Sequence, residues 1–367
     1  MVVRVLILSI TNVFRLDSFM FGQVVIGPPG SGKSTYCYGM YQFMSAIGRK
    51  LCVINLDPAN DRLPYPDCAL DIRDILTLDE IMEELDLGPN GGLMYALECL
   101  SSVEIENFVA KVKKLADENY YLLIDCPGQV ELFTHHNSLY QILKLISKKG
   151  GIRLCTVSLV DSIYLTSPSQ YISILLLSLR SMLQLDLPHV NVISKIDKLH
   201  SYGSLPFKLD YYTEVQDLHY LKPLLEKESN SILGKKFVRL TEAIGELIED
   251  FNLVSFEVLS VENKRSMIHL LNIIDKANGY MFGTSEIGGD TIWSEATRQS
   301  SLIKDIDVDI HERWIEQKDT FDRLEETEDR RGLNELNTTG KHEAGEEDED
   351  EAYEEDLREW ERLHSNS

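Results

Sequence analysis

Gln23-Val-Val-Ile26-Gly27-Pro-Pro-Gly-Ser-Gly-Lys33-Ser34 is the most informative segment of the chain. It fits the pattern GxxxxGK[ST] and lies between an apolar stretch and a helical pattern, as a phosphate-binding P-loop does. The glycines of such a loop let backbone N–H groups point at phosphates, and the following helix adds the positive end of its dipole. Lys33 would reach the β- and γ-phosphates and the Ser34 hydroxyl would ligate Mg²⁺. The predicted nucleotide-binding residues here are Gly27, Pro28, Pro29, Gly30, Ser31, Gly32, Lys33, Ser34 and Thr35.

Short apolar stretches alternate with helical patterns from residue 22 to about residue 280. This alternation predicts an α/β P-loop NTPase fold, with a predominantly parallel sheet flanked by helices. The expected strands are 23–26, 50–55, 120–125, 152–160, 189–194 and 253–259, and the expected helices are 33–47, 74–85, 101–118, 136–148 and 168–185. A longer helical stretch, about residues 204–250, separates the last two strands and predicts a helical insertion.

The ends of the chain differ from this middle part. We expect a leader at residues 1–20, a P-loop domain at residues 21–285, and a charged, largely disordered tail at residues 286–367. Residues 343–361 are rich in Asp and Glu with Arg358 as the one basic residue, so self-repulsion opposes folding there. An acidic arm for a basic partner and a solubilising tail both remain open.

Composition narrows the possible partners. The chain has 367 residues and a formal net charge of −24, which disfavours direct binding to nucleic acid because such binding depends on basic residues. No apolar run approaches the ~18 residues needed to span a membrane. The six cysteines are scattered without metal-binding spacing, as expected for reduced thiols of an intracellular protein. We therefore predict a cytoplasmic protein that contacts neither nucleic acid nor membrane directly.

A second motif, Asp125-Cys-Pro-Gly128-Gln129, follows the predicted strand 120–125. An Asp at the end of that strand can hold the Mg²⁺ shell together with Ser34. The Gly128 amide can sense the γ-phosphate, and the Gln129 side chain can orient an attacking water. With the P-loop upstream, this motif predicts a nucleotide-dependent switch.

A third motif, Ser194-Lys195-Ile196-Asp197, follows another apolar strand and indicates which base is bound. The Asp197 carboxylate can accept the N1 and N2 protons of guanine, whereas adenine has no such pair of donors, so GTP and GDP are favoured. The usual first residue of this NKxD pattern is Asn, and Ser194 departs from it. Val261, after the next strand, is expected to lie over the base edge through backbone amides. The predicted contacts outside the P-loop are Gly128, Ser194, Lys195, Asp197 and Val261.

Two further segments contain candidate functional residues. In Asn55-Leu-Asp57-Pro-Ala-Asn60, the Asp57 carboxylate could polarise a water or support the metal shell, although an Asp-Pro turn has the same sequence. Gly88-Pro89-Asn90-Gly91-Gly92 follows a helical pattern, and by itself it predicts only a turn.

Together, GPPGSGKS, NLDPAND, GPNGG, DCPGQVE and SKID resemble the GPN-loop GTPases over residues 21–282. The resemblance implies a dimeric GTPase that acts in assembly and nuclear import of RNA polymerase II, with a role for polymerase III as well. Implied partners are a second copy or a GPN-loop paralogue, polymerase subunits and assembly factors. Homodimer and heterodimer both remain open, and shuttling to the nucleus would accompany a cytoplasmic location.

The resemblance also assigns roles to individual residues. The dimer loop Gly88, Pro89 and Asn90 would reach across the interface and bring Asn90 to the partner's γ-phosphate or attacking water. Asp57 would be the catalytic carboxylate and Gln129 would help to hold the water. Three alternatives stay open: a GTP-binding assembly scaffold with negligible turnover, a MinD-like ATPase, and a small-molecule kinase.

Overall fold

The computed structural model describes residues 20–60, 63–66, 68–100, 102–228, 232–280, 310–325 and 327. The chain divides into two units, Met1–Asp307 and Val308–Ser367. The predicted leader, apart from Met20, and the acidic stretch 343–361 lie outside the described residues. In the second unit, residues 310–325 form helical turns around η6 (Glu312–Glu316), where Arg313 pairs with Asp322 and Glu325 at 2.9 Å each.

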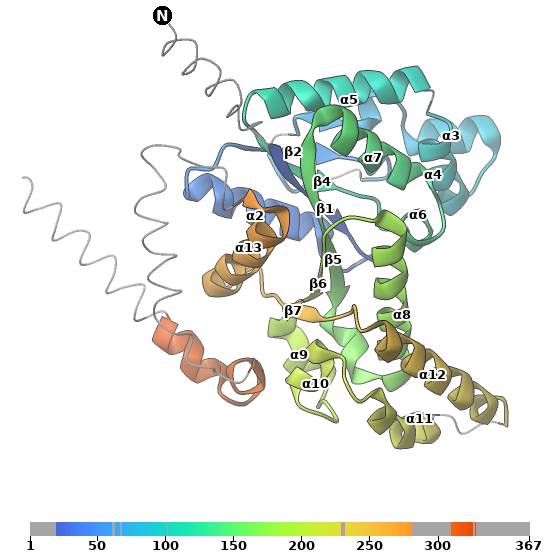
Figure 1. The fold of residues 1–367 in the computed structure, drawn as a ribbon, viewed down its shortest axis with the longest axis vertical. Helices are drawn as coiled ribbons and strands as arrows, with labels where there is room; N and C mark the ends of the chain where they lie inside the picture. The colour runs from blue at the N-terminus through green and yellow to red at the C-terminus, as the bar shows by residue number, and fades with distance from the viewer. Residues whose placement is uncertain are drawn as a thin grey trace, which may run out of the picture. The chain divides into compact units, whose positions relative to one another are not determined.

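Within the described part of the first unit, the strands form one parallel sheet (Figure 1). They are β1 (Met20–Ile26), β2 (Leu51–Asn55), β3 (Leu70–Asp71), β4 (Tyr121–Asp125), β5 (Ile152–Asp161), β6 (His189–Ser194) and β7 (Phe256–Val258). Their order is β3-β2-β4-β1-β5-β6-β7, with β1 near the centre. The predicted fold class is therefore confirmed.

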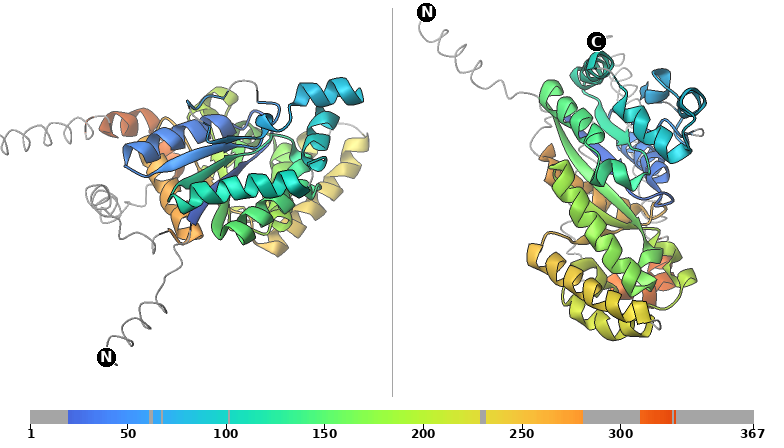
Figure 2. Two further views of the ribbon diagram at one scale, coloured as in Figure 1. Left: turned by 90° about the horizontal axis from the view of Figure 1, so that it is seen from above. Right: turned by 90° about the vertical axis from the view of Figure 1, so that its right-hand side faces the viewer.

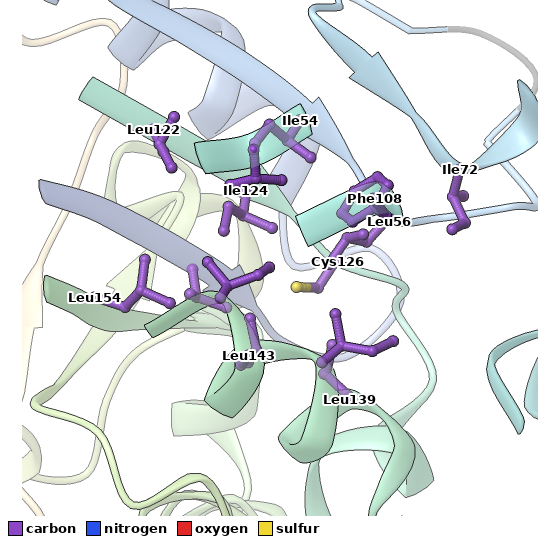
Figure 3. Close-up of a cluster of buried hydrophobic side chains, with 14 of the residues drawn as sticks. Ile54, Leu56, Ile72, Phe108, Leu122, Ile124, Cys126, Leu139, Leu143 and Leu154 are labelled. Carbon is purple, nitrogen blue, oxygen red and sulfur yellow. The ribbon is translucent and has the colours of Figure 1, made fainter. Parts of the chain in front are cut away.

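Helices cover both faces of the sheet because its strands are apolar on both sides. α2 (Lys33–Ala46) and α13 (Lys264–Asn278) pack on one face, while α5 (Ser102–Asp117) and α7 (Ser138–Gly150) pack on the other (Figure 1; Figure 2). Val25 belongs to the core under α2, and its neighbours Val24 and Ile26 belong to the opposite core. Figure 3 shows the core under α5 and α7, where Ile124 and Leu154 of the sheet meet Leu139 and Leu143 of α7.

The insertion lies between β6 and β7. Its helices are α9 (Leu199–Tyr202), α10 (Leu209–Glu214), α11 (Lys222–Glu228) and α12 (Ile232–Phe251). α11 and α12 pack on α8 (Pro168–Leu185), and the second view of Figure 2 shows α12 lying beside α8. Among the described residues, no helix is long and apolar enough to cross a membrane.

Several element boundaries differ from the expectation for local reasons. The predicted helix 74–85 starts later, as α3 (Leu78–Leu85), because Thr77 and Glu80 form a capping box at its first turn. The strand expected at 253–259 is the shorter β7. The prediction missed β3, α6 (Val130–Thr134) and α13. It also missed α4 (Pro89–Glu98), whose first residues fall in the segment 88–92 that was expected to be a turn.

Candidate functional site

The strand register gathers the predicted site residues at one edge of the sheet. Asp125 of β4 lies opposite Val25 of β1 and Asn55 of β2, and Asp161 of β5 lies opposite Ser194 of β6. Because all these strands are parallel, their carboxyl ends share this edge, where ligands of open α/β sheets bind. The P-loop and the motifs that begin at Asn55, Asp125 and Ser194 therefore meet there.

The P-loop has the backbone that a phosphate cradle needs. Gly27, Gly30 and Gly32 have φ values of 149°, 78° and 91°. A Cβ on Gly27 would lie 2.3 Å from the main-chain oxygen of Leu159, so only glycine fits beside β5. The Ser31 hydroxyl is buried without a hydrogen-bond partner among the described residues, which leaves it available to a ligand.

Lys33 links the P-loop to the second motif. Its side chain is buried and its Nζ lies 3.4 Å from the main-chain oxygen of Pro28. A Cβ on Gly128 would lie 2.9 Å from that Nζ, so the glycine allows the two motifs to approach each other closely. Burial lowers the pKa of Lys33, and the negative charges of Asp125 and Asp57 oppose this effect. The ammonium group and both predicted carboxylates thus belong to one cluster.

Asp125 has the environment of a metal-shell carboxylate. Burial raises its pKa to about 6, while the Ser34 hydroxyl and Lys33 favour the charged form. Its Oδ1 is buried and has no hydrogen-bond partner within the described chain. A buried carboxylate oxygen without a donor, next to a serine hydroxyl, fits the oxygen-rich shell that Mg²⁺ requires. The Tyr65 hydroxyl donates to Oδ2 at 3.4 Å, a contact that sequence reasoning missed.

Gln129 is the N-cap residue of α6, next to Gly128. Its Oε1 is buried and lacks a hydrogen-bond partner in the part of the chain that the structure describes. A buried amide oxygen without a donor can accept a hydrogen bond from a water. The geometry therefore leaves this group available for the role expected of it.

Ser194 ties the base-reading motif to the P-loop. Its hydroxyl contacts the main-chain oxygens of Ser31, at 2.7 Å, and Val160, at 3.1 Å. Lys195 has a φ of 56°, and its Nζ donates to the main-chain oxygen of Gly30 and to the Asp161 carboxylate at 2.6 Å each. The sequence analysis did not single out Asp161, although its place just after the predicted strand 152–160 could have indicated it.

Asp197 lies half-buried in η3 (Ile196–Lys198), beside the end of β7. The main-chain N–H of Ile196 donates to the oxygen of Leu259 at 3.3 Å, which joins this turn to the segment that contains Val261. The Val261 side chain packs on α2, since a Cβ on Gly39 would lie 2.4 Å from its Cγ1. The expected contact of Val261 with the base, through backbone amides, stays a prediction.

The Gly88-Pro89-Asn90 segment is the exposed start of a helix. Gly88 is the N-cap of α4 with a φ of −71°, Pro89 is the first helical residue, and all three side-chain positions face solvent. α4 packs against α3 and α7, away from α2 (Figure 1). At its other end, Glu98 pairs with His136 at 2.7 Å. The prediction of a turn at residues 88–92 is therefore wrong from Pro89 onward, because Pro at the first position of a helix favours helix formation.

Comparison with known proteins shows which family the chain belongs to. A sequence profile described as "Conserved hypothetical ATP binding protein" matches residues 25–280. GPN-loop GTPase 2 of Saccharomyces cerevisiae is 60% identical over 342 residues, which cover 93% of this chain and 97% of the yeast protein. The chain belongs to the GPN-loop GTPase family. The predicted membership is confirmed, and as a member of this family the chain is a P-loop GTPase.

Other GPN-loop GTPases give the same result. GPN-loop GTPase 2 of Schizosaccharomyces pombe is 52% identical, covering 83% of this chain and 94% of the relative. GPN-loop GTPase 2 of Danio rerio is also 52% identical, over 73% of this chain and 84% of the relative. The apo form of a GTPase from Pyrococcus abyssi superposes with a TM-score of 0.55 at 24% identity, covering 71% of this chain and 98% of that one. At this identity the likeness shows a shared fold.

Proposed function

We propose that this GTPase depends on Mg²⁺, works as a dimer, and uses its nucleotide-dependent change of shape in the assembly and nuclear import of RNA polymerases II and III. The observation that carries the enzymatic part is the cluster around Lys33. There, one buried ammonium lies among two carboxylates and buried oxygens that lack partners within the described residues. Such an arrangement is costly unless a phosphate and a cation complete it.

The chain's own residues divide the work of hydrolysis. Lys33 and the amides of the P-loop hold the β- and γ-phosphates, while Ser34 and Asp125 hold Mg²⁺. When bound, this cation neutralises charge on the phosphate oxygens. Asp57 polarises the attacking water and Gln129 orients it through Oε1. The water oxygen bonds to the γ-phosphorus as the bond to the β-phosphate oxygen breaks, so GDP, phosphate and a proton leave.

The base pocket supplies selectivity for guanine. Asp197 accepts the N1 and N2 protons of the base, and its turn is held to the P-loop through Ser194 and Lys195. Adenine offers no such pair of donors to the half-buried Asp197 carboxylate, so it should bind less tightly. A MinD-like ATPase, one of the alternatives, would lack this dependence on Asp197.

The proposal of a dimer is supported by the exposed start of α4. Asn90 lies on the surface, where a second copy or a GPN-loop paralogue could bring it to the partner's γ-phosphate or attacking water. The roles in polymerase assembly, the cytoplasmic location and the shuttling rest on family resemblance. Contacts with polymerase subunits and assembly factors, and not with nucleic acid or membrane, are part of the same proposal.

A cellular experiment separates the switch from a scaffold with negligible turnover. The Gln129→Leu variant should bind GTP but hydrolyse it slowly. If turnover drives the cycle, cells carrying this variant should retain RNA polymerase II in the cytoplasm, while wild-type cells import it. Normal nuclear polymerase together with lost hydrolysis would favour the scaffold.

A further inference from the structure

A ring of hydrogen bonds encloses the loop that contains Asp57. Asn55, the fully buried last residue of β2, holds the start of this loop. Its Nδ2 donates to the main-chain oxygen of Asp57 at 3.1 Å, and its Oδ1 accepts from the main-chain N–H of Asp57 at 3.1 Å. Because one rigid amide makes both bonds, the backbone of Asp57 cannot turn without breaking them.

Arg73 holds the other end of the loop. Its Nη1 donates to the main-chain oxygen of Asn60 at 2.8 Å. Its Nε lies 3.0 Å from both carboxylate oxygens of Asp71, and its Nη2 donates to Asp71 Oδ2 at 2.6 Å. The planar guanidinium thus bridges Asn60 and Asp71, which a lysine could not do with the same geometry.

Asp71 closes the ring. It lies opposite Asn55 in the β2–β3 register, and its Oδ1 accepts from Asn55 Nδ2 at 2.9 Å and from the Arg73 main-chain N–H at 2.9 Å. Burial opposes the charge of Asp71, but the hydrogen bonds from Arg73 and Asn55 keep its pKa below the usual value. The carboxylate therefore stays ionised at neutral pH and remains a strong acceptor.

The enclosed loop presents Asp57 to the reaction centre. The negative charge of Asp57 acts on the pKa values of both Lys33 and Asp125. Within the loop, Asp57 Oδ1 accepts from the main-chain N–H of Ala59 at 2.9 Å. The position of this carboxylate is thus set by the loop, and the position of the loop is set by the ring.

We propose that Asn55, Asp71 and Arg73 form a clamp that sets the position of the Asp57 carboxylate for hydrolysis. This inference rests on the proposed role of Asp57. Arg73 is then a positioning residue, whose guanidinium is directed at Asp71 and Asn60 and acts on the water only through Asp57. Since small displacements of catalytic groups cost large factors in rate, loss of the clamp should slow the chemical step more than it weakens nucleotide binding.

A double-mutant cycle between Arg73 and Asp57 tests the clamp. Single-turnover hydrolysis of radiolabelled GTP, GDP affinity and thermal unfolding are measured for wild type, Arg73→Gln, Asp57→Asn and the double variant. In the wild-type background, we expect Arg73→Gln to slow hydrolysis about tenfold or more and to leave GDP affinity within about twofold. In the Asp57→Asn background, Arg73→Gln should not slow hydrolysis any further. Arg73→Lys should behave like Arg73→Gln.

A matched control removes an arginine outside the clamp. Arg180 is exposed on α8, and Arg180→Gln should hydrolyse GTP like wild type. Wild-type hydrolysis by Arg73→Gln, or equal losses from Arg73→Gln in both backgrounds, would overturn the clamp and leave the proposed function intact. Wild-type hydrolysis by Asp57→Asn would instead refute the proposed role of Asp57, and the clamp with it.

Discussion

At the scale of single residues, the site depends on side chains that tie loops together as well as on those that touch the nucleotide. Ser194 hydrogen-bonds to the P-loop although the NKxD pattern has Asn at this position. A hydroxyl suffices because the main-chain oxygens of Ser31 and Val160 both lie within its reach. In this chain the Ser194 hydroxyl therefore joins the base-reading motif to the P-loop.

Asp161 should affect nucleotide affinity without touching the nucleotide. It holds Lys195 over the P-loop at 2.6 Å. We expect Asp161→Asn to weaken GDP binding about tenfold and to speed dissociation of a fluorescent GDP analogue, because Lys195 loses the charge that orients it. Asp186→Asn, which removes an exposed carboxylate at the end of α8, is the control. An unchanged dissociation rate in Asp161→Asn would contradict this.

Asp197 allows a test by exchange of the base. An Asn side chain offers one acceptor and one donor, which match the N1–H and the 2-oxygen of xanthine and mismatch the 2-amino group of guanine. Asp197→Asn should thus lose about a hundredfold in affinity for GDP and gain affinity for xanthosine diphosphate. Titration with both nucleotides measures this. Retained preference for GDP would mean that Asp197 does not contact the base.

At the scale of elements, β6 contains a group that makes stability depend on pH. Burial lowers the pKa of His189 to about 4 in the folded protein, although the Asn191 side chain opposes the shift. The unfolded chain takes up a proton near pH 6.5, so the stability contributed by neutral His189 is lost as pH falls toward 4. Between pH 7 and pH 5 we expect a loss of about 2 kcal/mol from this group.

Urea unfolding at the two pH values measures the loss. His189→Leu removes the titrating ring, so the fall in unfolding free energy between pH 7 and pH 5 should be smaller in this variant by about 2 kcal/mol. Other groups that titrate in this range are common to both proteins and cancel in the comparison. The same pH dependence in variant and wild type would show that His189 does not titrate in this way.

The start of α4 tests catalysis across a dimer. Asn90→Ala should keep GDP affinity and lower kcat about tenfold or more, since the lost contact belongs to the transition state. Mixing it with Asp57→Asn should restore about one quarter of wild-type turnover, because random pairing gives half mixed dimers with one complete site each. No recovery on mixing, with kcat lost in both parents, would place Asn90 outside the partner's site.

Some of these elements could be predicted from the sequence and others could not. The P-loop and the strands around it were predictable because local apolar patterns and glycine spacing define them. α4 was not, because its first residues are rich in glycine and its stability comes from packing on α3 and α7. The clamp could not be predicted either, because Asn55 and Asp71 are sixteen residues apart in the sequence and come together only through the pairing of β2 with β3. Contacts such as Lys195 with Gly30 depend on a strand order that periodicity does not reveal.

At the scale of the whole molecule, the formal net charge of −24 opposes close approach of two copies. A dimer therefore needs specific contacts to offset this repulsion, and these are expected at the start of α4. Light scattering should give the mass of two chains with a non-hydrolysable GTP analogue. One chain under every nucleotide condition would remove the homodimer and leave a paralogue as the partner.

Guanine-specific hydrolysis at this site is tested by phosphate release from GTP and from ATP, each with Mg²⁺, by the purified wild-type protein and by Asp57→Asn. The site described here predicts turnover of GTP, a kcat/KM for ATP lower by about a hundredfold or more, and loss of GTP turnover in the variant. Equal use of ATP would show that the site does not select guanine, and wild-type turnover by Asp57→Asn would show that Asp57 is not the catalytic carboxylate.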